Sequence, residues 1–394
     1  MILKIRKRFF SNFNVVDIII ILSILVSKSL YYETFGQNKL LIGFLLLIGI
    51  FALFKSYRKE LIFTKKTILL YFLIIIAVFI NPNAALSTSL VFLSDITIAL
   101  LFITLIPFYH FTSVFYKLMK ILMIFSLLKY PIILLHISSP FPDFISITGD
   151  HYQNFIFFGI FKGNTTYFQM LRNNGLWWEP GAFQIFINLA FLLGLLFKKV
   201  SNRDYFLFLI VIVTTFSTSG ILIFSVLSFI YFKRKSNLKL LLIAIVISLP
   251  LITASSYYQI VVQQKISLNN PSARSRYYDA IVPLRMFASN PIIGIGLGNK
   301  STLLKYTAKF SYGTGSNGML LLLANLGLLS FFIFIPLVFP NYLKNLPLDE
   351  RFLGSVCILL LFIPENFTII LIFSLLTFYG SKSLRTLRYE GLNY

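Results

Sequence analysis

The run Leu40-Leu-Ile-Gly-Phe-Leu-Leu-Leu-Ile-Gly-Ile-Phe-Ala-Leu-Phe54 contains no polar side chain. Only helices and closed barrels satisfy the backbone polar groups inside a bilayer, and the strands of a barrel alternate apolar and polar residues. Because this run does not alternate, it predicts a membrane helix. Comparable runs recur along the whole 394-residue chain, so the sequence predicts a polytopic helical membrane protein.

Composition supports this interpretation, because 57% of the residues are hydrophobic and only 12% are charged, against about 25% charged in soluble domains. We expect an all-α polytopic membrane protein in which residues 1–394 form a single integral membrane domain of about 12 transmembrane helices. Several stretches are shorter than the roughly 20 residues of a perpendicular span, which leaves the count open by about two. The expected spans lie near residues 13–30, 39–54, 67–81, 89–109, 117–135, 182–197, 205–217, 219–232, 238–254, 317–339, 352–364 and 367–380.

The distribution of Lys and Arg predicts the orientation. The net charge is +22, and most basic residues fall in short loops that lie on one side of the membrane, as the positive-inside rule requires. We therefore expect both termini in the cytoplasm, a basic N-terminus retained as a signal anchor, and no nucleic-acid partner. The loops expected in the cytoplasm are 1–12, 55–66, 110–120, 198–204, 233–239, 340–351 and 381–394.

Two long segments, 136–181 and 255–316, are expected on the outer side of the membrane. The second breaks the charge bias, because it contains seven cations and a single acid, Asp279. This excess predicts an anionic ligand, since arginine suits phosphate oxygens. The alternative is that long loops are translocated regardless of charge. The cations are Lys265, Arg274, Arg276, Arg285, Lys300, Lys305 and Lys309.

Residues 273–287 predict an interfacial helix with a kink near Pro283. Arg274 and Arg285 are eleven residues apart, which places them on one face but about 16 Å apart along the axis. Either they hold different parts of an extended ligand, or the kink brings them together, or they meet lipid headgroups. The glycine-rich stretch 290–299 predicts a loop that lets backbone approach a ligand, or simply a turn.

The stretch Arg172-Asn-Asn-Gly-Leu-Trp-Trp-Glu-Pro-Gly-Ala-Phe-Gln184 places polar chemistry beside a hydrophobic helix. Pro180 predicts that this helix starts just after Glu179. Glu179 either complements the helix dipole or acts as a general base where water is partly excluded.

Three neighbours of Glu179 are further candidates. Trp177 and Trp178 either stack on sugar rings or anchor the protein at the membrane interface. Arg172 either pairs with Glu179 or binds phosphate.

Other polar features are isolated. Ser217-Thr-Ser-Gly220 predicts a hairpin tip that caps the following helix, and Asp95 predicts either a buried relay or a partner for an arginine. The single Cys357 excludes an intrachain disulfide, and the three histidines are scattered. We expect no metal and no cofactor.

Three pieces in this order resemble one family: Arg172–Gln184, then 272–299, then 316–330. The family is the O-antigen polymerase and ligase superfamily (Wzy- and WaaL-like lipid-linked glycan transferases). The resemblance implies a GT-C-like membrane glycosyltransferase in the bacterial inner membrane, without a metal. It also implies a donor glycan on undecaprenyl diphosphate that binds from the periplasmic face, with membrane lipids and a chain-length regulator of the Wzz type as partners.

The resemblance implies the activity of an O-antigen polymerase, which we would expect to transfer a growing glycan onto the next lipid-linked repeat unit. Fixed arginines would stabilise the charge on the departing diphosphate, and a carboxylate would activate the acceptor hydroxyl. Glu179 is the first candidate for that carboxylate and Asp279 the second. The expected diphosphate-binding residues are Arg172, Arg274, Arg276 and Arg285, and the expected glycan-binding residues are Trp177 and Trp178.

Two alternatives come from different classes. The first is a ligase that moves finished glycan to lipid A–core, and the second is a flippase for the lipid-linked glycan. The ligase branch usually has a histidine where Ser316 and Asn317 stand here, and often an arginine in the hairpin that reads 217–220 here, so both departures favour the polymerase. A flippase would line a transmembrane cavity with charges, whereas here the cations cluster in the outer loops.

Overall fold

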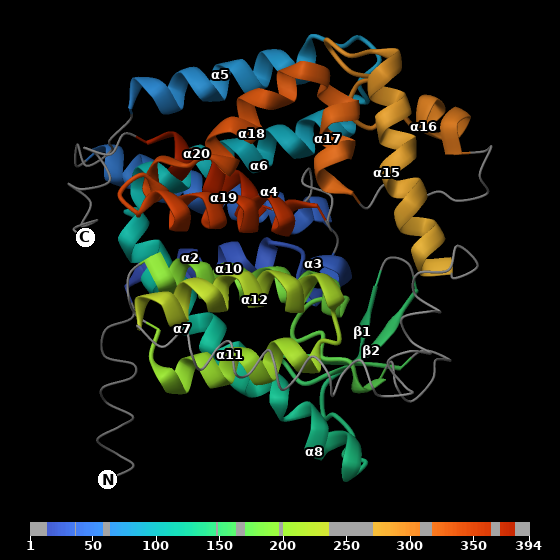
Figure 1. Ribbon diagram of the computed structural model, residues 1–394. Coiled ribbons are helices and arrows are strands. Elements are labelled where there is room, and N and C mark those ends of the chain that lie inside the picture. The colour runs from blue at the N-terminus through green and yellow to red at the C-terminus, as the bar shows by residue number, and fades with distance from the viewer. Residues whose placement is uncertain are drawn as a thin grey trace.

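The computed structural model describes residues 14–35, 37–57, 64–146, 149–162, 170–196, 200–235, 271–307, 317–363 and 371–382. This part of the chain is mostly helical and carries one small antiparallel sheet (Figure 1). The helices are α2 (Val15–Val26), α3 (Leu30–Phe35), α4 (Gln37–Tyr57), α5 (Lys65–Phe79), α6 (Leu86–Leu105), α7 (Phe108–Leu127), α8 (Lys129–Leu134), α10 (Pro180–Leu196), α11 (Asn202–Thr214), α12 (Thr218–Arg234), α15 (Pro271–Ser289), α16 (Lys300–Thr307), α17 (Gly318–Leu326), η2 (Gly327–Ser330), α18 (Phe331–Val338), η3 (Asn341–Leu343), α19 (Leu348–Phe362) and α20 (Leu371–Ser381). The strands are β1 (Phe144–Ile145), β2 (His151–Asn154) and β3 (Gly159–Phe161), in that order across the sheet.

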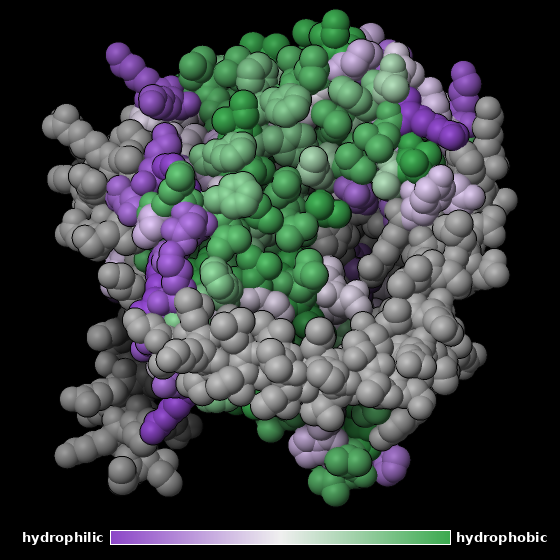
Figure 2. Space-filling model, viewed as in Figure 1, coloured by the Kyte–Doolittle hydropathy of each residue, from purple (hydrophilic) through white to green (hydrophobic). Residues whose placement is uncertain are grey.

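Within the described ranges, three helical segments are long and apolar enough to cross a membrane: Leu86–Leu105, Phe108–Leu134 and Gly318–Leu343. Shorter apolar helices accompany them, among them Val15–Val26 and Pro180–Leu196. Hydrophobic side chains cover the middle of the face seen in Figure 2, and hydrophilic ones gather along one edge and over α15 and α16. These features belong to a mostly helical membrane protein. The expected span 238–254 lies outside the described residues.

One end of the helix assembly carries the sheet, α15 and α16, on the right in Figure 1; we call it the sheet end. A β-bridge joins Ser29, just before α3, to Trp177, just before α10. The Asn81 amide, in the turn between α5 and α6, donates to the Gly294 carbonyl at 2.7 Å. Turns that are far apart in the sequence are thus tied together at this end.

Other contacts join helix ends away from the sheet, at what we call the opposite end. His110 Nε2 lies 2.7 Å from Asp17 Oδ1, which joins the beginnings of α7 and α2. The Tyr379 hydroxyl donates to the Ile106 carbonyl at 2.8 Å, which joins the end of α20 to the end of α6. Contacts between helix ends therefore occur at both ends of the described helix assembly.

Helix α10 is the central helix. All its residues from Ala182 to Leu196 are buried. The Asn188 amide nitrogen donates to the carbonyls of Gln184 and Gly220, each at 3.1 Å, whereas its Oδ1 has no hydrogen-bond partner among the described residues. A small residue at Gly220 lets α12 approach α10 closely, as at many helix contacts in membranes.

The stretch 110–120, expected as a loop, is helical, so that expectation is wrong. Helix α7 begins at Phe108, directly after Pro107, and continues through Lys120. Lys120 forms an ion pair with Asp204 at the start of α11. Lys120 can therefore lie within a helix, because Asp204 on the neighbouring helix α11 balances its charge.

This ion pair should make stability depend on pH. Partial burial would raise the pKa of the Asp204 carboxyl, but hydrogen bonds from Lys120 and Ser201 outweigh burial and hold that pKa below its ordinary value. A lowered pKa stabilises the fold above the ordinary aspartate value, and the stabilisation disappears as the pH falls through the lowered value.

We expect Asp204→Asn to lower the free energy of unfolding at neutral pH by about 1 kcal/mol, with no difference from wild type in acid. Thermal unfolding of the purified protein in detergent, measured against pH, tests this. Asp143→Asn is the control, because Asp143 pairs with Lys162 at 2.9 Å on the surface and should change little. An equal loss from both variants would contradict the prediction.

Candidate functional site

Residues 171–174, ahead of α10, are held by buried polar groups. The Lys129 ammonium, which is buried in α8, donates to the Arg172 carbonyl at 2.5 Å and to Asn174 Oδ1 at 3.2 Å. The Asn173 amide donates to Ser126 Oγ at 3.0 Å. A loop with this many buried partners forms a rigid base for the residues that follow it.

Glu179 stands on this base, directly before α10. The helix begins at Pro180, as the sequence predicts. Residues 173–177 are buried, whereas the Glu179 side chain is exposed and forms no ion pair with a described residue. Among the described residues no side chain covers the Glu179 carboxylate, so the expected exclusion of water around it stays a prediction.

The two tryptophans differ in surroundings. Trp177 is fully buried, its ring is stacked 5.2 Å from Phe183 and 4.3 Å from Phe186, and its indole N–H donates to the Ser27 carbonyl at 3.3 Å. Trp177 is therefore part of the core and has no surface for a sugar, which corrects the glycan-binding expectation for this residue. Trp178 is only half-buried.

Trp178 lies between a cation and the sheet. Lys28 Nζ sits 4.6 Å from its ring centroid, a distance at which a cation is attracted to an aromatic face. The Tyr152 hydroxyl, on β2, donates to the Trp178 carbonyl at 2.7 Å. Burial, followed by the charges of Asp150 and Glu179, raises the pKa of Tyr152, so the hydroxyl stays protonated and keeps this bond.

Arg172 does not pair with Glu179. Its Nε donates to the Thr215 carbonyl at 3.3 Å, at the turn between α11 and α12. Of the two alternatives for Arg172, pairing with Glu179 is therefore wrong. Phosphate binding stays a prediction.

Helix α15 confirms the predicted helix and extends it by two residues at each end, to Pro271–Ser289. It packs on α17 and, in Figure 1, runs across the direction of α5, α6 and α12. Pro283 lies inside it and cannot donate to the carbonyl of Asp279, four residues earlier. Arg274 and Arg276 belong to its first turns, but their side chains lie outside the described residues.

Asp279 and Arg285 occupy different environments on α15. Asp279 is 4% exposed and Arg285 is exposed, and each already takes part in an electrostatic or hydrogen-bonding interaction. A buried, engaged carboxylate is less accessible to an acceptor hydroxyl than the exposed Glu179. The contacts of α15 and those of Glu179 form two separate groups at the sheet end.

The glycine-rich loop 290–299 is a packing element. Its Ile295 N–H donates to the Ala324 carbonyl at 2.9 Å, and the Leu328 N–H donates to the Pro291 carbonyl at 2.8 Å. Two of its glycines approach the backbones of α17 and of the turn before α6 rather than open space. These contacts agree with a turn, and they join residues 290–299 to α17 and η2. The approach of a ligand to this backbone stays a prediction.

Two further predictions concern helix starts and a buried acid. Ser217 Oγ accepts from the Gly220 N–H at 3.3 Å and so caps α12, as predicted. Asn317 Oδ1 accepts from the Leu320 N–H at 3.0 Å and caps α17. Asp95 is buried on α6, and the described part of the chain contains no arginine that pairs with it.

Sequence reasoning missed Lys28, Lys129 and Tyr152 as parts of the site. Lys28 and Lys129 could have been noticed only because each lies near the expected outer end of a predicted span, 13–30 and 117–135. No family model, no curated protein and no solved structure matches this chain. A functional proposal therefore has to be built from the chemistry of the sheet end.

Proposed function

We propose that this protein is an O-antigen polymerase, which transfers a growing glycan from undecaprenyl diphosphate onto the next lipid-linked repeat unit. The observation that carries the proposal is the placement of Glu179. An exposed carboxylate stands on a buried, hydrogen-bonded base at the start of the central helix, next to the half-buried Trp178. Such placement suits a group that must orient and deprotonate an acceptor hydroxyl.

The roles of the other residues follow from the charge that the reaction develops. When the anomeric C–O bond breaks, the undecaprenyl diphosphate leaves with negative charge, which arginines on α15 stabilise. We assign this role to Arg274, Arg276 and Arg285, assisted by Arg172. Glu179 takes the proton from the acceptor hydroxyl, and Trp178 offers its ring to a sugar.

The proposal includes a membrane arrangement. The chain has about 12 spans and a GT-C-like architecture in the bacterial inner membrane. Both termini are cytoplasmic, and the sheet end faces the periplasm. In this proposed arrangement α15 lies at the periplasmic surface of the membrane. The diphosphate of a lipid-linked donor would lie at the same level.

The test is a lipopolysaccharide gel from a strain that lacks the gene, in a Gram-negative host with O-antigen. Core that carries a single repeat unit supports the polymerase, because flipping and ligation still work. Bare core with lipid-linked polymer in the periplasm would instead identify a ligase. Bare core without outward-facing lipid-linked glycan would identify a flippase.

We expect Arg274→Ala to reduce polymerisation by roughly tenfold to a hundredfold, while the protein still reaches the membrane. The reason is that the substitution removes one of the three cations that α15 is proposed to supply to the leaving diphosphate. Modal chain length on a gel, normalised to membrane-inserted protein, measures the effect. Arg203→Ala, at the start of α11 and the opposite end, is the control. Normal chain lengths in Arg274→Ala would remove Arg274 from the site.

A further inference from the structure

A pocket at the opposite end lies where α18 ends and α19 begins. Its volume is about 350 Å³. The chain reverses direction there through Pro340 and η3, so the end of α18 and the first turns of α19 face each other across the pocket. The lining residues that matter are Phe339, Lys344, Leu348, Arg351, Phe352 and Ser355.

One face of α19 forms a wall of this pocket. Leu348, Phe352 and Ser355 follow at positions i, i+4 and i+7, which places them on a single stripe of the helix. Leu348 is 72% exposed and Phe352 is 65% exposed, and Phe339, opposite them, is 67% exposed. The pocket therefore offers uncovered apolar side chains to whatever occupies it.

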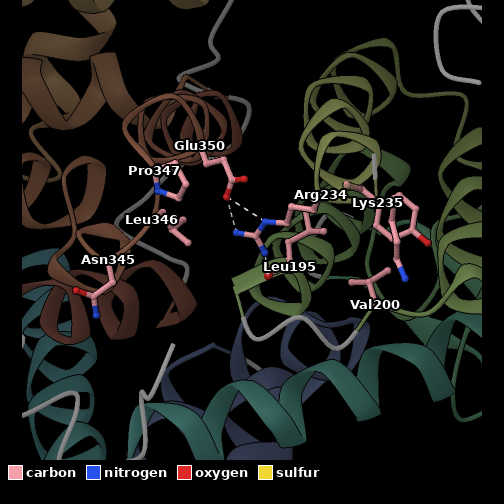
Figure 3. A pocket seen from close by; sticks show the side chains of 9 residues that line it. Leu195, Val200, Arg234, Lys235, Asn345, Leu346, Pro347 and Glu350 are labelled. Atoms are coloured by element: carbon pink, nitrogen blue, oxygen red, sulfur yellow. Dashed lines mark hydrogen bonds and ion pairs between the residues drawn. The ribbon is translucent and has the colours of Figure 1, made fainter. Parts of the chain in front are cut away.

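The charges around the pocket are unbalanced. Two acids, Asp349 and Glu350, begin α19, and both are neutralised by α12. Lys233 pairs with Asp349, and Arg234 donates through Nε and Nη2 to Glu350 Oε2 at 3.0 and 2.6 Å. Figure 3 shows the second pair in a neighbouring pocket of about 490 Å³, on the other side of the turn.

In the described part of the chain, no acid pairs with Lys344 or Arg351. Neither side chain has a hydrogen-bond or ion-pair partner in the part of the chain that the structure describes. Both line the 350 Å³ pocket. An occupant of this pocket must therefore carry negative charge next to the two cations and apolar surface next to the phenylalanines.

Ser355 supplies a third polar group. It is 5% exposed, lines the pocket, and its hydroxyl has no hydrogen-bond partner among the described residues. A buried hydroxyl usually finds a partner, often the carbonyl one turn earlier. Ser355 lies one turn beyond Arg351, about 6 Å further along α19, so its hydroxyl lies at a deeper level than the Arg351 position.

We propose that this pocket binds an anionic glycerophospholipid from the bilayer leaflet at the opposite end. The phosphate lies between Lys344 and Arg351, and an ester carbonyl below it accepts from the Ser355 hydroxyl. The acyl chains lie on Phe339 and Phe352. A cationic pocket between helices at a membrane surface suits such a headgroup. The inference requires a membrane protein but does not depend on transferase activity.

The experiment uses the full-length protein in an uncharged detergent and follows its unfolding temperature. Phosphatidylglycerol should raise this temperature, and phosphatidylcholine should not. Inorganic phosphate at the same concentration should leave it unchanged, because it lacks the acyl chains. In Lys344→Gln/Arg351→Gln, half-maximal stabilisation should require roughly tenfold more phosphatidylglycerol.

The matched control is Lys65→Gln/Lys66→Gln, which removes the same charge from the exposed start of α5, outside the pocket. This variant should respond to phosphatidylglycerol like the wild type. An equal loss in both variants, or full stabilisation of the pocket variant, would overturn the proposal. Stabilisation by inorganic phosphate alone would overturn the choice of a lipid.

A second measurement keeps the wild-type charges, in case the double variant does not fold. Phe352→Trp places a fluorophore in the pocket at an exposed position, and Phe72→Trp places one on the exposed face of α5. In mixed bilayers, brominated phosphatidylglycerol should quench the fluorophore in the pocket at least about twice as strongly as brominated phosphatidylcholine, because the two cations favour the anionic headgroup. The fluorophore on α5 should not distinguish the two lipids. Equal quenching in the pocket would refute the proposal.

Discussion

Glu179→Gln is expected to lower the rate of polymerisation by about a hundredfold to ten-thousandfold, the usual contribution of a general base. The amide keeps the shape of the carboxylate but cannot accept the proton of the acceptor hydroxyl. The exposed carboxylate has no ion pair with a described residue, so the substitution should cost less than about 1 kcal/mol of stability. Polymer formed from lipid-linked repeat units in membranes, per amount of inserted protein, is the measurement.

Asp279→Asn is the matched comparison for Glu179→Gln, because Asp279 is the second candidate carboxylate. It is buried and engaged in α15, so we expect lower stability and a smaller loss of rate in the folded fraction. If Asp279→Asn abolished polymerisation and Glu179→Gln did not, the two roles would be exchanged. If neither variant lost activity, the base would have to be sought elsewhere.

Gly294→Ala is expected to remove roughly 2–5 kcal/mol of stability, the combined cost of a left-handed backbone and of overpacking. Gly294 has φ +69°, and an added Cβ would overlap the backbone carbonyl of Asn325. Backbone cannot move aside as the end of a side chain can. Monodisperse protein recovered after extraction in detergent, and its unfolding temperature, measure the loss.

Gly149→Ala separates the two causes of this loss. Gly149 also has a positive φ, +87°, but no atom of the described residues lies within 4 Å of an added Cβ. This variant should lose only the backbone part, roughly 1–2 kcal/mol. Equal unfolding temperatures for the two variants would show that the close contact with Asn325 contributes nothing.

Features that depend on neighbours in the chain could be predicted from the sequence. Pro180 fixed the start of α10, Ser217 caps α12, and the arginine-rich stretch forms α15. Each of these depends on a few adjacent residues and on backbone rules that hold in any surroundings. The apolar runs predicted their helices for the same reason.

Features that depend on distant partners could not be predicted. Trp177 looked like an interfacial residue, but a turn that ends near Ser27 and side chains of α10 cover it. Lys120 looked like part of a loop, but Asp204 balances its charge within a helix. A charged or aromatic residue indicates the membrane interface only when no distant part of the chain packs against it.

The candidate site shows the same division. The position of an acid at the start of a helix could be predicted, because Glu179 precedes Pro180. The neighbours of Glu179 could not be predicted from the sequence. Lys28 and Tyr152 precede Glu179 by 151 and 27 residues. Nothing local in either segment indicates that it meets Trp178.

The bond between the Asn81 amide and the Gly294 carbonyl spans 213 positions in the sequence. At a translation rate of about 5–20 residues per second, the turn before α6 leaves the ribosome roughly 10 to 40 s before its partner does. Until then, the growing chain exposes an unpaired amide and an uncovered turn to the translocation machinery. The sheet end is therefore completed only after Gly294 has been made, and a chain that stops before Gly294 should be a substrate for proteolysis.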